Sequence, residues 1–125
     1  MNIAVTIISS LISGIVGVII STVYYRKYER YQMKLKTLKD FAAYRWNLKG
    51  PNFTKALNEI FIVFQNSDKV TSALMQFHKT ITSKNTELSD DDLIKLFKSM
   101  CEDLKINPNK FSESFFLKPF NVKKE

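Results

Sequence analysis

Few side chains in this sequence have the chemistry of a catalyst or a metal ligand. The chain holds one His, His78, and one Cys, Cys101. His78 has no evident acid or base partner around it. Cys101 falls on the apolar face of an expected helix, which favours a buried thiol over a nucleophile. No P-loop, dinucleotide-binding, zinc-protease or serine-hydrolase motif occurs. We therefore expect no enzyme, no metal site and no cofactor.

The acidic run Asp90–Asp92 has a structural explanation beside a functional one. Three carboxylates could attract a cation, but the spacing of an EF-hand is missing. Ser89 precedes them as a potential N-cap, and acidic residues stabilise the positive end of a helix. The pattern therefore predicts a helix that begins at Ser89.

Composition indicates what kind of scaffold carries these residues. The chain has 125 residues, 45% of them hydrophobic, with only three Gly and three Pro and a net charge of +7. This length suits about one domain, and the scarcity of Gly and Pro argues against a turn-rich β fold. We expect an all-α protein in three parts: a transmembrane helix over 1–25, a basic juxtamembrane helix over 26–49, and a cytoplasmic helical bundle over 50–125.

Residues 2–25 contain no charged side chain. As a helix, 23 residues extend for roughly 34 Å, slightly more than a hydrocarbon core of about 30 Å. A cleaved signal peptide is the main alternative, but it needs a basic start and a shorter apolar run of about 7–15 residues. We therefore expect a retained transmembrane helix.

Basic residues follow this segment and predict its orientation. Only Glu29 opposes them, and no Lys or Arg precedes the span. The positive-inside rule then places the N-terminus outside and residues 26–125 in the cytoplasm, in a bacterial inner membrane. The basic residues near the span are Arg26, Lys27, Arg30, Lys34, Lys36 and Lys39.

Small residues form a stripe along the expected transmembrane helix. They cover an arc of about 140° at 100° per residue. Small residues at every fourth position allow close helix contact in membranes. The stripe predicts a homo-oligomer, either through tight helix packing or with hydroxyls of several copies lining a pore. Its members are Thr6, Ser9, Ser10, Ser13, Gly14, Gly17 and Ser21.

The juxtamembrane segment has heptad spacing and most of the excess charge. Residues 26–49 carry a net charge of +6, whereas residues 50–125 carry +1. Its apolar seam predicts self-association, with packing on the cytoplasmic domain as the alternative. The seam residues are Tyr24, Tyr28, Tyr31, Leu35, Leu38 and Ala42.

Part of this charge lies too far from the bilayer to be explained by anionic lipid. Lys39, Arg45 and Lys49 lie well beyond a Debye length of roughly 8 Å from the start of the segment. Trp46 adds an aromatic face beside the Arg45 guanidinium, as in single-strand binders. We predict that Lys39, Arg45, Trp46 and Lys49 bind nucleic acid. The alternative is that Trp46 packs in the core and Arg45 caps or pairs locally.

The C-terminal part reads as a small helical bundle. Gly50-Pro51-Asn52 interrupts the juxtamembrane helix, with Asn52 a potential N-cap. Three amphipathic segments follow, centred on 53–64, 70–81 and 89–104, with a loop at 83–87 between the last two. A Phe-rich tail then packs on the bundle or on a neighbouring subunit.

Part of the sequence resembles a family of small bacterial single-pass membrane proteins. The residues that carry this resemblance are Tyr44, Arg45, the run Gly50-Pro51-Asn52-Phe53-Thr54-Lys55-Ala56-Leu57-Asn58-Glu59-Ile60, and then Phe64, Val70 and Ala73. The leucine-rich run Leu93–Met100 extends the resemblance. Met75 stands where that family often has an aromatic residue.

The architecture is also similar to that of membrane effectors of the Hailong anti-phage system. This resemblance implies a homo-oligomeric ion channel with a nucleotidyltransferase partner, whose short single-stranded DNA product holds the channel shut. It supplies no ligand residues. The alternative from another class is a membrane-tethered adaptor that docks a soluble protein through residues 53–125.

Overall fold

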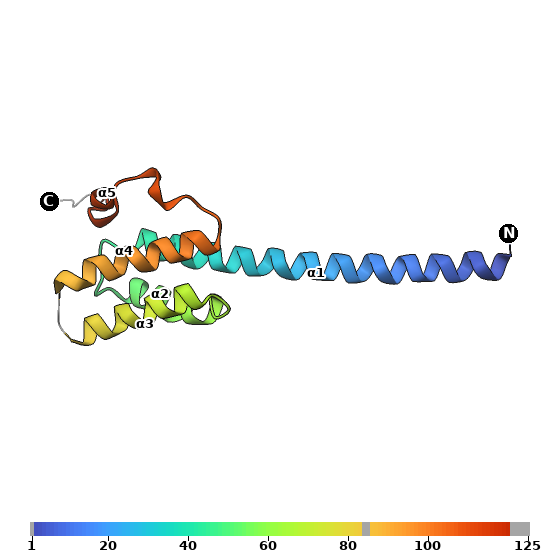
Figure 1. Ribbon diagram of the computed structural model, residues 1–125, viewed down its shortest axis with the longest axis horizontal. Coiled ribbons are helices and arrows are strands. Elements are labelled where there is room, and N and C mark those ends of the chain that lie inside the picture. The colour runs from blue at the N-terminus through green and yellow to red at the C-terminus, as the bar shows by residue number, and fades with distance from the viewer. Residues whose placement is uncertain (1, 84–85, 121–125) are drawn as a thin grey trace. The chain divides into compact units, whose positions relative to one another are not determined.

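The computed structural model describes residues 2–83 and 86–120, and every regular element among them is helical. The elements are α1 (Ile3–Ala43), α2 (Pro51–Val63), α3 (Asp68–Thr82), α4 (Thr86–Asp103), the 3₁₀ turn η1 (Pro108–Lys110) and α5 (Glu113–Leu117), as labelled in Figure 1. The all-α prediction is confirmed. The chain divides into two compact units, Met1–Gln32 and Met33–Glu125.

The first unit is the N-terminal part of α1. Every described side chain up to Gln32 is exposed in the single chain. At about 1.5 Å per residue, the 41 residues of α1 extend for roughly 62 Å. The helix is long and apolar enough to cross a membrane, and none of its apolar window is buried, unlike the core helix of a soluble protein.

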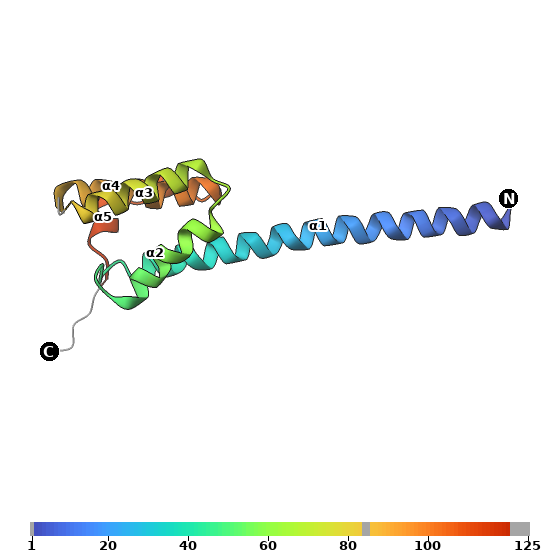
Figure 2. The same ribbon diagram turned by 90° about the horizontal axis from the view of Figure 1, so that it is seen from below.

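The second unit is a helical bundle with an aromatic centre. In both views α3 and α4 lie side by side and antiparallel (Figures 1 and 2). Phe41, from the last turn of α1, is fully buried, and its ring centroid lies 5.1 Å from that of Phe53 and 6.4 Å from that of Phe116. The buried apolar core also contains Leu38, Ala56, Ile60, Phe64, Val70, Ala73, Phe77, Leu93, Ile94, Leu96, Met100, Cys101 and Leu104.

Three predicted boundaries need correction. The juxtamembrane helix ends at Ala43 rather than at Lys49. α2 has Gly50 at its N-cap and Pro51 in its first turn, so Asn52 is not the cap. α4 begins at Thr86 rather than at Ser89, so residues 86 and 87 are helical; residues 84 and 85 of the expected loop lie outside the described part.

Local hydrogen bonds explain why α1 ends early. Between α1 and α2 the chain makes turns, in which the Asn47 N–H donates to Tyr44 O at 3.1 Å and the Gly50 N–H to Asn47 O at 3.0 Å. A Cβ atom on Gly50 would lie 2.6 Å from Asn47 Nδ2. The absence of a side chain at Gly50 therefore permits the tight turn into α2, and Pro51 fits the first helical position that follows.

The end of α4 is a Schellman motif. The Ile106 N–H donates to Cys101 O at 2.8 Å and the Lys105 N–H to Glu102 O at 3.1 Å. Lys105 has φ 58°, the left-handed conformation that usually belongs to glycine. The motif satisfies two carbonyls at the end of α4 and turns the chain toward η1.

We predict that Lys105→Gly raises the free energy of unfolding by about 1 kcal/mol, because glycine adopts this φ without steric cost. Urea unfolding followed by circular dichroism, with the protein in a non-ionic detergent, measures the change. The matched control is Lys95→Gly, at an exposed site inside α4, which should lower stability by about 1 kcal/mol. Destabilisation by both glycines would contradict the assignment of the motif.

Candidate functional site

The small-residue stripe of α1 is open to another helix. A Cβ atom built on Gly14 or Gly17 would meet nothing within 4 Å. Neither glycine is therefore required by contacts within the chain, and both leave room for close approach by a second helix.

Two hydroxyl groups of α1, Ser10 in the stripe and Thr22 outside it, are satisfied by their own helix. The Ser10 hydroxyl donates to Thr6 O at 2.9 Å and the Thr22 hydroxyl to Val18 O at 2.8 Å. Such bonds remove the cost of leaving these donors unpaired in hydrocarbon. This geometry suits contact between helices in lipid, and it leaves the hydroxyl lone pairs free to accept from water or from another helix.

The predicted heptad seam splits between the two units. Tyr24, Tyr28 and Tyr31 are exposed. Leu38 is buried in the core of the second unit and Leu35 packs against it. For these two leucines, the alternative prediction of packing on the cytoplasmic domain is the one that the structure supports. Only the three tyrosines of the seam remain exposed for self-association with other copies of the chain.

Two basic residues of the juxtamembrane segment form ion pairs. Lys34 Nζ lies 2.8 Å from Asp103 Oδ2 on α4 and 5.5 Å from the centroid of the Phe64 ring, in a half-buried position. Lys36 Nζ lies 3.1 Å from Asp40 Oδ2. The hydrogen bond and the charge of Asp40 raise the pKa of Lys36. These contacts make both lysines less available for an external anion.

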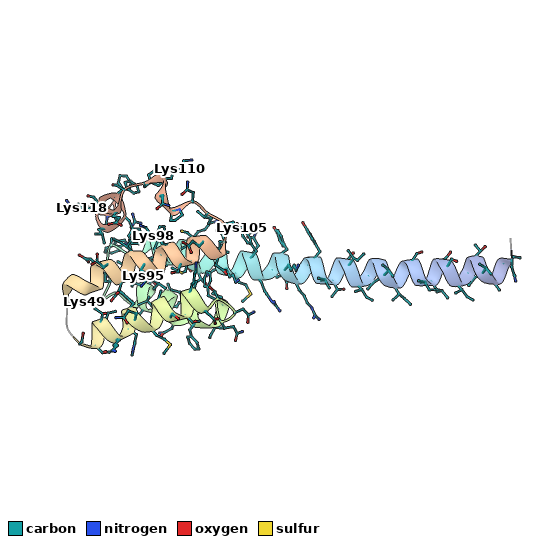
Figure 3. The ribbon with its side chains drawn as sticks, in the orientation of Figure 1. Lys49, Lys95, Lys98, Lys105, Lys110 and Lys118 are labelled. Atoms are coloured by element: carbon teal, nitrogen blue, oxygen red, sulfur yellow. The ribbon has the colours of Figure 1, made fainter. Side chains whose placement is uncertain are left out.

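The predicted nucleic-acid residues have different environments. Lys39 and Lys49 are exposed, the latter in the turn after α1 (Figure 3), and Trp46 is 49% exposed. The alternative that placed Trp46 in the core is wrong.

Arg45, by contrast, connects the end of α1 to α5. Its Nε donates to Phe116 O at 2.7 Å and its Nη1 to Ala42 O at 2.5 Å, while Cζ lies 5.1 Å from the centroid of the Phe116 ring. Burial lowers the pKa of Arg45. The alternative of a local capping role is confirmed, and it makes Arg45 part of the domain's packing.

The candidate catalytic and cation-binding residues are not assembled into a site. His78 is exposed and Cys101 is a buried free thiol. The run Asp90–Asp92 begins at the fifth residue of α4 rather than at its N-cap, and Asp92 accepts a hydrogen bond from the Thr80 hydroxyl. Among the residues that the structure describes, no group of three His, Cys, Asp or Glu side chains could hold a metal ion.

Two apolar hollows were not predicted from the sequence. One lies between α2 and α3 and is lined in part by the exposed side chains of Phe61, Met75 and Ile81. The other lies between α4 and the chain segment from Ile106 to Phe116. The sequence did contain a signal for these hollows: the helices carry more large apolar residues than one buried face of each helix requires.

The chain belongs to a family of unknown function, DUF6680, whose pattern matches residues 1–114 and therefore includes both units. No curated protein and no solved structure matches the chain.

The buried thiol gives a test of the packing of α4. Burial raises the pKa of Cys101 to about 11 from the 9.0 of an unperturbed thiol. Because only the thiolate reacts, we predict that iodoacetamide alkylates the folded protein at pH 8 about 100-fold or more slowly than the urea-unfolded chain. The rate in the folded state should rise as pH increases toward 11. Equal rates in the folded and unfolded states at pH 8 would contradict the burial of this thiol.

Proposed function

We propose that this protein is a single-pass membrane effector that assembles from identical copies and forms a ligand-controlled ion pore in a bacterial inner membrane, in defence against phage. One observation carries the proposal. The apolar part of α1 is exposed in the single chain. Its stripe of small residues is not covered by any side chain of the described residues.

Lipid covers the bulky side of such a helix but does not by itself draw helices together. Association in a membrane depends on close packing and on polar contacts between helices, both of which small residues permit. Ser9, Ser13, Gly17 and Ser21 lie at every fourth position. In an assembly of several copies, these residues would form the tight helix contact or line the conducting path.

The flanking charges support one orientation. Arg26, Lys27 and Arg30 are exposed and follow the uncharged segment directly. With an inward-facing basic flank, the N-terminus lies outside and the bundle lies in the cytoplasm. Each basic group near anionic lipid contributes about 1 kcal/mol to the attraction.

We assign the control of the pore to the cytoplasmic unit. Lys39, Trp46 and Lys49 are exposed, and several copies would present a ring of such groups to a polyanion such as a short single-stranded DNA made by a nucleotidyltransferase partner.

Gly17→Leu tests the stripe. We expect the variant to insert into the membrane but to lose toxicity on overexpression in bacteria and to lose ion conductance in liposomes, because a leucine side chain prevents close approach of the helices. Conductance is measured as dye-detected potassium efflux, and insertion as resistance to carbonate extraction.

Ile15→Phe is the matched control, since it adds bulk at an exposed site about 160° around the same helix from Gly17, on the lipid-facing side. It should retain wild-type conductance. Wild-type conductance of Gly17→Leu would contradict a role for the stripe, and a wild-type protein without any conductance would favour the adaptor described next.

A membrane-tethered adaptor is the second candidate, and one observation favours it. Phe61, Met75 and Ile81 expose apolar surface at a groove between α2 and α3. Exposed apolar surface of this kind marks contact sites for other proteins. An adaptor would need this groove and the tether but no conduction.

Lys39→Glu combined with Lys49→Glu tests the polyanion. We expect the double variant to bind a fluorescent single-stranded oligodeoxynucleotide at least about tenfold more weakly and with a smaller dependence on salt, because each phosphate contact releases counterions. Fluorescence anisotropy at 50 and 200 mM KCl measures both.

The matched control is Lys55→Glu with Lys79→Glu, which makes the same charge change on exposed sites of α2 and α3. Equal loss of binding in both double variants would mean that net charge alone, rather than the predicted residues, attracts the oligonucleotide.

A further inference from the structure

The hollow under the C-terminal segment has the size of a small-molecule site. Its volume is about 490 Å³, within the range of roughly 300–1,000 Å³ that is usual for ligand pockets. α4 contributes Phe97, Lys98 and Cys101, and the covering segment contributes Ile106 and Phe115. Arg45 reaches the same wall from the chain that follows α1.

Local structure explains why the segment covers this space. The Schellman motif turns the chain at Lys105, so that Ile106 and Cys101 line one cavity. Ser112 then caps α5 by accepting from the Phe115 N–H at 3.1 Å. Phe116 stacks on Phe97 with ring centroids 4.4 Å apart, which holds α5 over the cavity.

The charge of Arg45 is not balanced within this part of the fold. Among the residues that the structure describes, no carboxylate lies within 4 Å of its guanidinium. Its hydrogen bonds go to two backbone carbonyls, which use two of its five N–H donors. A partly buried cation gains free energy from an anion that reaches it, because burial weakens its solvation by water.

One carboxylate at the edge of the cavity limits the charge of that anion. Lys98 lies in the wall, and its Nζ is 3.3 Å from Glu113 Oε1 on α5 (Lys98 is labelled in Figure 3). A second negative charge on a ligand would therefore meet Glu113. The rest of the lining is mainly apolar and aromatic, which suits a hydrocarbon or aryl body.

We propose that this cavity binds an organic monocarboxylate with an apolar body, with its carboxylate on Arg45 and its acyl chain or ring among Phe97, Ile106 and Phe115. The site goes beyond the proposed pore, because it requires neither assembly nor conduction.

Calorimetric titration of the full chain in a non-ionic detergent tests the proposal. The probes are octanoate and 4-phenylbutyrate, which distinguish an aliphatic from an aromatic body. 4-Phenyl-1-butanol supplies the body without the charge, and acetate supplies the charge without the body. We expect saturable binding of one carboxylate probe per chain, and affinities at least about tenfold weaker for the alcohol, which lacks the charged group that hydrogen-bonds to Arg45, and for acetate, which lacks the apolar body.

Variants locate the binding. Arg45→Gln should weaken binding of the preferred probe at least about tenfold, and Ile106→Trp should weaken it similarly by filling the cavity without touching the Arg45 hydrogen bonds. Lys79→Gln removes one positive charge from an exposed site on α3 that does not line the cavity, and it should leave the affinity unchanged. Circular dichroism establishes whether each variant is folded.

Equal affinity for 4-phenylbutyrate and 4-phenyl-1-butanol would overturn the proposal, because it would show partition into detergent or apolar surface. Unchanged affinity in a folded Arg45→Gln or Ile106→Trp variant would overturn it as well. Should Arg45→Gln fail to fold, Ile106→Trp and the comparison of probes on the wild-type chain decide the outcome. No result of this experiment depends on whether the protein conducts ions.

Discussion

The uncharged half of α1 is left exposed by the described residues of its own chain. Twelve large aliphatic side chains between Ile3 and Val23 are about half or more exposed. Covering each contributes roughly 1 kcal/mol or more, so together they amount to on the order of 12 kcal/mol. That equals the whole stability of a typical domain, about 5–15 kcal/mol. Under the proposed function, lipid and other copies of the helix would provide this coverage.

The same helix also supplies the centre of the bundle. Phe41 is fully buried between Phe53 and Phe116. Leu38, also from the C-terminal part of α1, is buried as well. α1 is helical at every residue from Ile3 to Ala43. A signal that changes the packing around Phe41 therefore acts on residues that are part of the membrane-length helix itself, and this continuity is what a ligand-controlled pore would use.

Sequence patterns predicted the helices well but could not say what each helix contacts. The spacing of Leu35, Leu38 and Ala42 suits a partner helix in another copy and a partner helix in the same chain equally, because heptad and α-helical periods hardly differ over two turns. Phe41, which is fully buried, was outside the predicted seam. The structural role of Arg45 was also hidden, since its Nε donates a hydrogen bond to Phe116 O, 71 positions away. Such a contact leaves no trace in a local pattern.

The net charge likewise overstated how many basic side chains of residues 26–49 are free to bind a polyanion. The excess of +6 in residues 26–49 is a sum over side chains, whereas binding depends on which of them are free. Lys34 and Lys36 form ion pairs, and Arg45 lines the cavity beside α5 and bonds to backbone carbonyls there, rather than lying on the exposed surface with Lys39 and Lys49. The exposed remainder consists of a group next to the apolar segment, Arg26, Lys27 and Arg30, and a separate pair, Lys39 and Lys49. In the proposed membrane orientation, the first group would lie where anionic lipid attracts it. Under the proposed function, a polyanion would therefore be recognised mainly by Lys39 and Lys49 repeated over several copies, and oligomerisation would then be a condition for tight binding as well as for conduction.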